Sequence, residues 1–317
     1  MQNYLQYDDS NDSEIFLEQE VYDLNLRLST CTVANSDGKP NEDAFASARV
    51  NDQIWLAVFD GTTSLKSIPA LGDTSGARFA SHFLKDKFTA SFTDAQKSPR
   101  DLLLYLNELL LQQTGELGGS LSDTHSLPAS MATVVKIDLA TNILSFAHVG
   151  DTYGIIFHND CSSLVFTDDK NNKFDQGMFD LIRKIAIENS ITNRQARQND
   201  EVKKALYEMF IKRNNNPDGT GSGLVNGDPY MVKYLHTGEF SISDIKAVLL
   251  ATDGLEVQGQ GILDDKFRSY LLSEFKDTGF LGVIKLKKES EDADPDWNNI
   301  RYKHSDDATG IMIEFNQ

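Results

Sequence analysis

Three apolar stretches of the sequence lead into an aspartate that lies beside a glycine, and this repetition constrains the fold more than any other feature. The stretches are "IWLAVFDG", "SFAHVGD" and "AVLLATDG", whose aspartates are Asp60, Asp151 and Asp253. A single Asp-Gly pair is a common turn. Three buried strands that each bring a carboxylate to one end predict instead a shared site at the edge of a sheet.

The order of the predicted elements indicates an α+β fold. Residues 24–33, 44–60 and 129–167 contain short strands spaced too closely for parallel crossovers, and residues 230–237 and 246–254 resume the strands. Helical periodicity marks residues 75–88, 98–117 and 263–290. Because strands and helices come in separate runs, we expect a four-layer α-β-β-α sandwich: two antiparallel sheets with helices packed on both outer faces.

Composition narrows the functional classes. The 48 acidic residues outnumber the 30 basic ones, and a net charge of −18 disfavours binding to nucleic acid or to anionic membranes. Neither a membrane-spanning stretch nor a signal peptide is evident, and two cysteines make no disulfide framework. We therefore expect a cytoplasmic protein.

Domain organisation is predicted from the same patterns. Residues 1–20 form a polar N-terminal segment that we expect to be loosely ordered, and residues 21–317 form one domain. Within it, residues 168–230 form an insertion that is helical and then rich in glycine, and its glycines would let it move.

Five aspartates lie at the edges of apolar strands: Asp43, Asp60, Asp151, Asp253 and Asp306. Carboxylates that converge repel each other and raise each other's pKa values, and divalent cations remove that cost. Ligands that are all oxygen, without a His/Cys cluster, favour Mg²⁺ or Mn²⁺ over Zn²⁺. A carboxylate shared by two ions is the geometry of metal-assisted phosphoester hydrolysis.

The order of motifs "NED", "VFDG", "SMATVV", "HVGDT", "ATDGL" and "DDAT" closely resembles the metal-dependent protein phosphatases of the PPM (type-2C) family, in their bacterial form. The similarity extends from about residue 24 to residue 315. It implies a β-sandwich flanked by helices and a centre of two Mn²⁺ or Mg²⁺ ions, with a weaker third. It also implies hydrolysis of phosphoserine and phosphothreonine in proteins, opposing a Ser/Thr kinase, and we expect a monomer. In this resemblance, residues 168–230 correspond to the flap beside the active site.

The resemblance assigns roles residue by residue. Asp60 would bridge both ions, and the carbonyl of Gly61 would bind the second. Asp253 and Asp306 would complete the first ion, which makes these two aspartates and Asp60 the expected catalytic residues. Asp306 is chosen over Asp307 because the closing motif of the family places its ligand first.

Three further acids have roles by the same resemblance. Glu42 and Asp43 would hold water molecules bound to the metal ions. Asp151 matches the aspartate that, together with Asp253, helps to bind the weaker third ion in bacterial members.

The sequence departs from the family pattern at two positions. Where the family has a phosphate-binding arginine, this chain has Gly38 followed by Lys39. Lys39 is the expected substitute, although lysine lacks the planar fork of arginine. Thr62 replaces a histidine that eukaryotic members carry. The missing arginine keeps open the alternative of a module that binds phosphoproteins without turnover. A two-metal hydrolase of small phosphoesters is a further alternative.

Three other residues are interpreted as structural. Alternation along "SFAHVGD" places His148 on the opposite face from Asp151, so His148 is expected to pack in the core. Arg78 and Arg301 could replace the missing arginine, but ion pairing at the edge of the core is the expected role of both.

Overall fold

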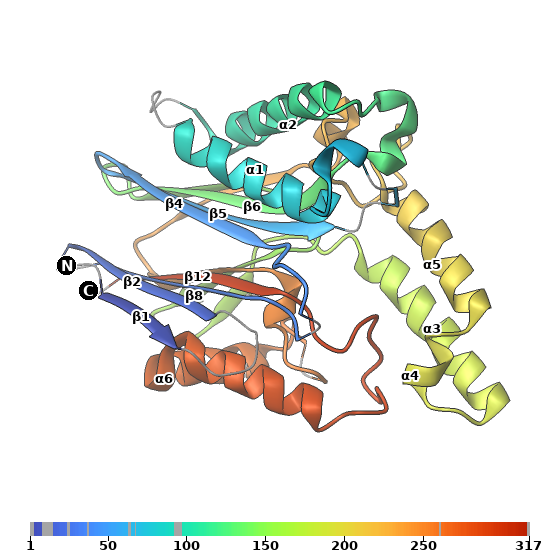
Figure 1. Ribbon diagram of the computed structural model, residues 1–317. Coiled ribbons are helices and arrows are strands. Elements are labelled where there is room, and N and C mark those ends of the chain that lie inside the picture. Colours follow the sequence, from blue (N-terminus) through green and yellow to red (C-terminus); the bar gives the residue numbers. More distant parts are fainter. Residues whose placement is uncertain are drawn as a thin grey trace.

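The computed structural model describes residues 3–7, 15–23, 26–36, 38–62, 65–66, 68–91, 97–259 and 261–315. Two sheets lie face to face, and helices cover the outer face of each (Figure 1). This arrangement confirms the four-layer α+β sandwich predicted from the sequence.

Every strand pairing is antiparallel. One sheet has seven strands, in the spatial order β1 (Asn3–Tyr7), β2 (Ile15–Asp23), β3 (Leu26–Val33), β12 (Ala308–Phe315), β11 (Ile245–Ala251), β8 (Tyr153–His158) and β9 (Ser163–Val165). The other has five, in the order β10 (His236–Ser241), β7 (Ile143–Val149), β6 (Ala129–Asp138), β5 (Gln53–Thr62) and β4 (Ala44–Val50).

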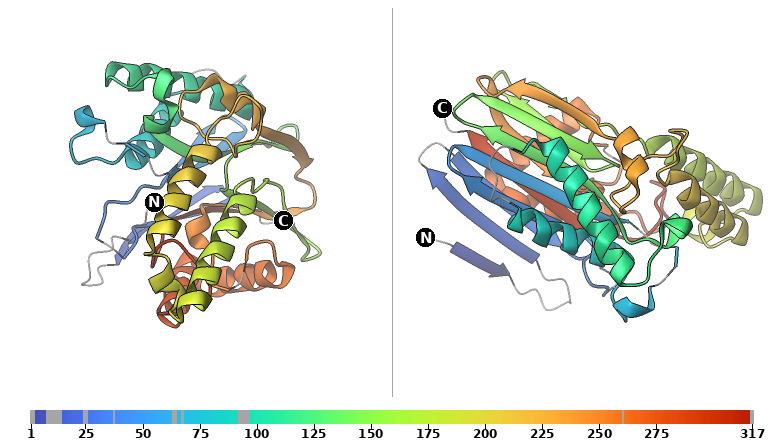
Figure 2. Two further views of the ribbon diagram at one scale, coloured as in Figure 1. Left: turned by 90° about the vertical axis from the view of Figure 1, so that its right-hand side faces the viewer. Right: turned by 90° about the horizontal axis from the view of Figure 1, so that it is seen from above.

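The helices divide into three groups. Two cover the five-stranded sheet, α1 (Gly76–Ala90) and α2 (Pro99–Glu116), and one covers the seven-stranded sheet, α6 (Asp265–Asp292), with a break at Gly279. At one end of the sandwich lie α3 (Asn172–Asn189), α4 (Asn193–Ala196) and α5 (Asp200–Arg213), which cross it in the side view (Figure 2). Short 3₁₀ turns are η1 (Pro69–Leu71), η2 (Leu121–Ser126), η3 (Pro229–Lys233) and η4 (Asp253–Leu255).

Parts of the polar N-terminal segment belong to strands, since β1 pairs with β2 and β2 pairs with β3. One prediction about an individual segment is wrong. The strand predicted over residues 230–237 starts only at His236, because a 3₁₀ turn precedes it. That turn begins where the Asp228 side chain accepts a hydrogen bond from Tyr230 N, with Pro229 in the first position.

Strand β5 shows how the layers are built. Ile54, Leu56 and Val58 are buried in the core between the two sheets. Their neighbours Trp55, Ala57 and Phe59 are buried under α1 and α2 on the outer face. Side chains of a strand alternate between faces, so a strand covered on both faces reads as a continuous apolar run.

The insertion at residues 168–230 packs closely. Helices α3, α4 and α5 share a small core that includes Ile182, Val202 and Leu206. The glycine-rich loop behind α5 is also packed: a Cβ on Gly221 would lie 1.9 Å from the carbonyl oxygen of Asn214. Glycine is therefore needed at position 221 for close packing.

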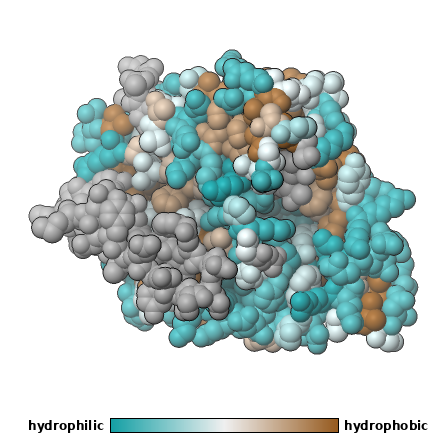
Figure 3. All heavy atoms as spheres, viewed as in Figure 1, coloured by the Kyte–Doolittle hydropathy of each residue, from teal (hydrophilic) through white to brown (hydrophobic). Residues whose placement is uncertain are grey.

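None of the described helices is both long and apolar enough to cross a membrane. Hydrophilic residues cover most of the described surface on the face drawn in Figure 3, including much of the helical insertion at its right-hand side.

Candidate functional site

The core between the sheets becomes polar toward the end where α3 and α5 lie. Thr133, His148 and Thr252 are all buried there. Thr133 Oγ1 lies 2.9 Å from His148 Nδ1 and 2.7 Å from Thr152 Oγ1, which gives the buried ring a polar partner. This polar layer separates the apolar core from a group of carboxylates.

Asp60 lies at the end of β5, on the face that looks toward the other sheet. Asp60 lies on the same face of the strand as Leu56 and Val58, because the register of β5 with β6 is unbroken from Gln53 to Thr62. The Asp-Gly pair is therefore not a turn here. A Cβ on Gly61 would lie 2.4 Å from the carbonyl oxygen of Glu42, so only glycine lets these segments approach so closely.

Asp43 is buried just before β4. Its Oδ2 accepts a hydrogen bond of 2.7 Å from Thr252 Oγ1, and Thr252 immediately precedes Asp253 after β11. This bond connects the two sheets at the carboxylate end. A tight turn also follows β11, because a Cβ on Gly254 would lie 1.7 Å from the carbonyl oxygen of Asp307.

The two neighbouring aspartates before β12 have different surroundings. Asp307 is buried and accepts hydrogen bonds from Asn35 N, Asn35 Nδ2 and Glu42 N, at 2.7 to 2.9 Å. Asp306 is partly exposed and lines the cleft in front of the carboxylates. These placements support the choice of Asp306 as the residue available to a ligand.

The carboxylates are coupled electrostatically. Burial raises the pKa of Asp60 well above its usual range, and the charges of Asp43 and Asp253 raise it further. Burial and the charge of Asp306 likewise raise the pKa of Asp253. Five acids predicted from the sequence therefore do come together, but without a cation they repel one another.

Asp151 has a cation of its own. Its Oδ2 lies 3.2 Å from Nη2 of Arg213, the last residue of α5, and also accepts a hydrogen bond from Asn171 Nδ2. Arg213 Nη1 lies 3.7 Å from Asp175, and Tyr302 Oη donates to the same carboxylate. Asp151 Oδ1 is buried and has no hydrogen-bond partner among the described residues.

A second cation approaches from the loop before β12. Lys303 Nζ pairs with Asp306 Oδ1, three residues later. Burial opposes the charge of Lys303, but Asp306, Asp253 and Asp60 outweigh it and raise the pKa of the ammonium group above its ordinary value. The ammonium group therefore lies in the field of three carboxylates.

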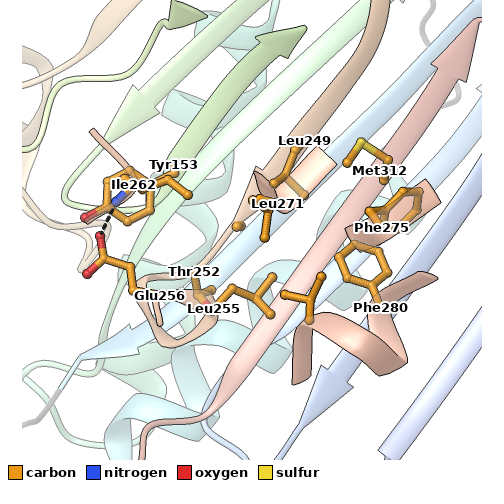
Figure 4. Close-up of a pocket in the computed structure, with 12 residues that line it drawn as sticks. Tyr153, Leu249, Thr252, Leu255, Glu256, Ile262, Leu271, Phe275, Phe280 and Met312 are labelled. Atoms are coloured by element: carbon orange, nitrogen blue, oxygen red, sulfur yellow. Dashed lines mark hydrogen bonds between the residues drawn. The ribbon is translucent and has the colours of Figure 1, made fainter. Parts of the chain in front are cut away.

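The cleft in front of these groups has a volume of about 560 Å³ and is lined by both sets of residues, including Asp151, Asp253 and Lys303. A neighbouring pocket between the seven-stranded sheet and α6 is different (Figure 4). It is lined mainly by apolar side chains, such as Leu249 and Phe280, and its volume of about 10 Å³ would hold at most a single water molecule. The open acidic cleft is therefore the candidate site.

Two of the predicted residues are not joined to the carboxylate group. Glu42 accepts a hydrogen bond of 2.6 Å from Ser75 Oγ, at the start of α1. Lys39 is exposed in the loop before β4, and no described contact links it to the acids. Among the described residues, no three His, Cys, Asp or Glu side chains are close enough to hold an ion as they stand. Ion binding would therefore require the carboxylates to draw together.

The residues interpreted as structural have structural contacts. His148 Nε2 donates to the carbonyl oxygen of Asp168 at 2.8 Å, which satisfies the second nitrogen of the buried ring. Arg301 pairs with Asp294 at 3.2 Å, and Arg78 donates to the carbonyl oxygen of Asn41.

Neither Arg213 nor Lys303, the two cations that pair with the acids of this site, was predicted from the sequence. Arg213 lies 62 residues from Asp151, so no local pattern indicated their contact. Lys303 lies three residues before Asp306, and this short spacing is the signal that could have identified it. Asp307 was considered only as an alternative ligand, and its role in joining the loop at Asn35 to β12 depends on tertiary contacts.

A family model described as "Protein phosphatase 2C" matches residues 32–281. No curated protein matches the chain.

Solved structures resemble this one over nearly its whole length. A serine/threonine phosphatase of S. agalactiae has a TM-score of 0.56 and 15% identity, with 92% of this chain and 99% of that chain covered. Stp1 from Staphylococcus aureus, a serine/threonine phosphatase, has a TM-score of 0.54 and 17% identity, with 94% and 100% covered. RsbX in complex with magnesium has a TM-score of 0.53 and 14% identity, with 94% and 99% covered. At these identities the structures show a shared fold.

Proposed function

The chain belongs to the protein phosphatase 2C family, and we propose that it hydrolyses phosphoserine and phosphothreonine in proteins at a centre of two Mn²⁺ or Mg²⁺ ions. The observation that carries the proposal is the group of coupled carboxylates in the open cleft. Oxygen-only donors suit hard cations. A cation would also offset the repulsion that raises the pKa values of Asp60 and Asp253.

Three aspartates are proposed to hold the first ion: Asp60, Asp253 and Asp306. Asp60 and the carbonyl oxygen of Gly61 would hold the second. Asp43, held by Thr252, is proposed to orient water at this centre. When bound, such a pair of ions lowers the pKa of a water molecule and offsets charge on the phosphoryl oxygens.

The fold fixes the backbone at these residues before any ion arrives. Asp60 is held at the end of a doubly covered strand, and Ser130 Oγ donates to its carbonyl oxygen at 2.8 Å. The turn after β11 fixes the backbone of Asp253, because Gly254 packs against the backbone of Asp307. Only the carboxylate side chains would then have to draw together around an ion.

The test is phosphate release from a phosphothreonine peptide by the metal-stripped protein, with Mn²⁺, Mg²⁺, Ca²⁺ or EDTA added. We expect turnover with Mn²⁺ or Mg²⁺, and we expect Asp60→Asn to reduce it by at least about a thousandfold. Asp138→Asn is a matched control, because Asp138 also ends a strand but lies at the opposite end of the same sheet. Asp138→Asn should retain activity.

Two other outcomes point to other functions. Absence of turnover with retained Mn²⁺ binding would contradict the proposal and favour a module that binds phosphoproteins. Turnover of an aryl phosphate but not of phosphopeptides would favour a hydrolase of small phosphoesters. Opposition to a Ser/Thr kinase, a third ion, a cytoplasmic location and a monomeric state remain predictions.

A further inference from the structure

We propose that Lys303 is the residue that binds the phosphoryl group of the substrate in this cleft. The proposal rests on the proposed function, but it concerns a residue that neither the motifs nor the resemblance indicated. It starts from the position of Lys303, whose ammonium group pairs with Asp306 and lines the cleft beside Asp253. The charges of Asp253 and Asp60 also act on this ammonium group. Asp306, Asp253 and Asp60 are the three aspartates proposed for the first ion.

Four cationic residues line the cleft, and their contacts distinguish them: Arg183, Lys287, Arg301 and Lys303. Lys287 is buried, pairs with Glu291 at 2.8 Å and donates to Ser305 Oγ at 2.8 Å. Arg301 is buried against Asp294 and nearby carbonyl oxygens. Both hold the loop before β12 in place, and neither is open to a ligand.

The remaining two cations are exposed, but only one lies among the carboxylates. Arg183 pairs with Asp180 at 2.8 Å within α3. Lys303 has a side chain that is 44% exposed, and its charge acts on Asp43, Asp253 and Asp307. Lys303 is thus the cation that is both next to the carboxylates and reachable from the cleft.

Metal binding would make this ammonium group available. A divalent ion carries twice the charge of a lysine and competes with it for the same carboxylates. Lysine has a compact charge on a flexible stem, so the ammonium group can leave Asp306 and still remain at the wall of the cleft. A phosphoryl group entering the cleft brings the negative charge that this released cation would pair with.

Among the described residues, the position at which the family binds phosphate offers no arginine. The family position for phosphate binding is taken by Gly38, and the adjacent Lys39 is exposed without a described contact to the acids. Lys39 and Lys303 are therefore rival candidates from two different loops, and each provides the control for the other.

The experiment measures binding of inorganic phosphate to the Mn²⁺-loaded protein by calorimetry, for wild type, Lys303→Met, Lys303→Arg and Lys39→Met. We expect Lys303→Met to weaken phosphate binding by about tenfold or more, as loss of a charge-assisted contact does. Lys303→Arg should stay within about threefold of wild type because it keeps the charge, and Lys39→Met should change binding by less than about twofold.

A second titration measures Mn²⁺ binding to the metal-free variants. Lys303→Met should bind Mn²⁺ at least as tightly as wild type, because a competing cation is gone. Weaker Mn²⁺ binding would show that Lys303 acts through the metal centre and would overturn the proposal. Unchanged phosphate binding in Lys303→Met, with or without a loss in Lys39→Met, would overturn it as well.

Phosphate binding needs no turnover, so the two proposals can fail separately. If the Mn²⁺-loaded wild type binds phosphate but releases none from a phosphothreonine peptide, the proposed function fails and the role of Lys303 is still decided by the variants. If the Mn²⁺-loaded wild type does not bind phosphate, the inference about Lys303 is wrong whatever the turnover.

Discussion

Two cations pair with acids that line the cleft, and their surroundings differ sharply. Arg213, at the end of α5, has a side chain that is 9% exposed and lies between Asp151 and Asp175. Lys303, in the loop before β12, has a side chain that is 44% exposed and pairs with Asp306. The arginine side of the cleft is closed, and the lysine side is open to solvent.

This difference distinguishes ion pairs that stabilise the fold from ion pairs that a ligand can replace. A buried ion pair is needed for the stability of the fold, since removing either partner leaves an uncompensated charge inside the protein. An exposed pair contributes little to stability and is easily exchanged for another ion. The acids on the arginine side are therefore committed to holding the helical insertion, and those on the lysine side are available to metal and substrate.

The strongest test of this comparison replaces each cation by methionine. Arg213→Met should lower the free energy of unfolding of the metal-free protein by about 3–5 kcal/mol, because the buried Asp151 and the partly buried Asp175 lose their cation. Lys303→Met should lower it by less than about 1 kcal/mol. Urea denaturation followed by circular dichroism measures both. Equal losses in the two variants would remove the distinction between the closed side and the open side.

The site residues that could be predicted are those that a short stretch of sequence is enough to indicate. Asp60 and Asp253 were found because a strand's alternation and its end can be read from a few consecutive residues. Arg213 could not be found in this way, because its contact with Asp151 depends on how the whole insertion packs. Lys303 lies only three residues before Asp306, but its spacing alone did not show that its side chain lines the cleft.

The differences from the predicted fold have the same origin. Apolar residues after Pro229 suggested a strand, but the cap formed by Asp228 favours a 3₁₀ turn there. Near the N-terminus, acidic composition hid the alternation of Ile15, Leu17 and Val21 in the sequence, although Ile15–Asp23 forms β2. Composition measures how polar a segment is, whereas pairing depends on the strand beside it.

A second prediction concerns His148, which belongs to the closed side because it donates to the carbonyl oxygen of Asp168 at the start of the insertion. Burial lowers its pKa from 6.5 to about 4. Between these pH values the histidine is protonated in the unfolded chain but neutral in the native protein. Its contribution to the free energy of unfolding is therefore complete above pH 6.5 and decreases as the pH falls toward 4. The loss amounts to about 3 kcal/mol.

His148→Gln should flatten this part of the stability profile, as measured by urea denaturation at a series of pH values. Above pH 6.5 the substitution should leave the slope of the profile unchanged, because the ring is neutral in both states there. A slope between pH 6.5 and 4 as steep in His148→Gln as in wild type would contradict the prediction.

The smallest expected effect concerns the glycine-rich loop that holds Arg213 in place through bonds from Ser222 to the carbonyl oxygen of Arg213. Gly219 and Gly223 both have positive φ, at +79° and +94°. A Cβ on Gly219 would meet open space, whereas one on Gly223 would lie 2.4 Å from Tyr234 Cβ. Gly219→Ala should therefore cost only the conformational penalty, about 1 kcal/mol.

Gly223→Ala adds overpacking to the same penalty and should cost about 2 kcal/mol more than Gly219→Ala, as measured by thermal or urea unfolding. The pair separates two reasons for glycine in this loop, because backbone conformation is common to both positions and close packing is present at only one. If the loop were free to move away from Tyr234, the added methyl group would be accommodated and the two variants would lose the same stability. A clear difference between them would mean that the closed side is held shut by packing as well as by the charge of Arg213.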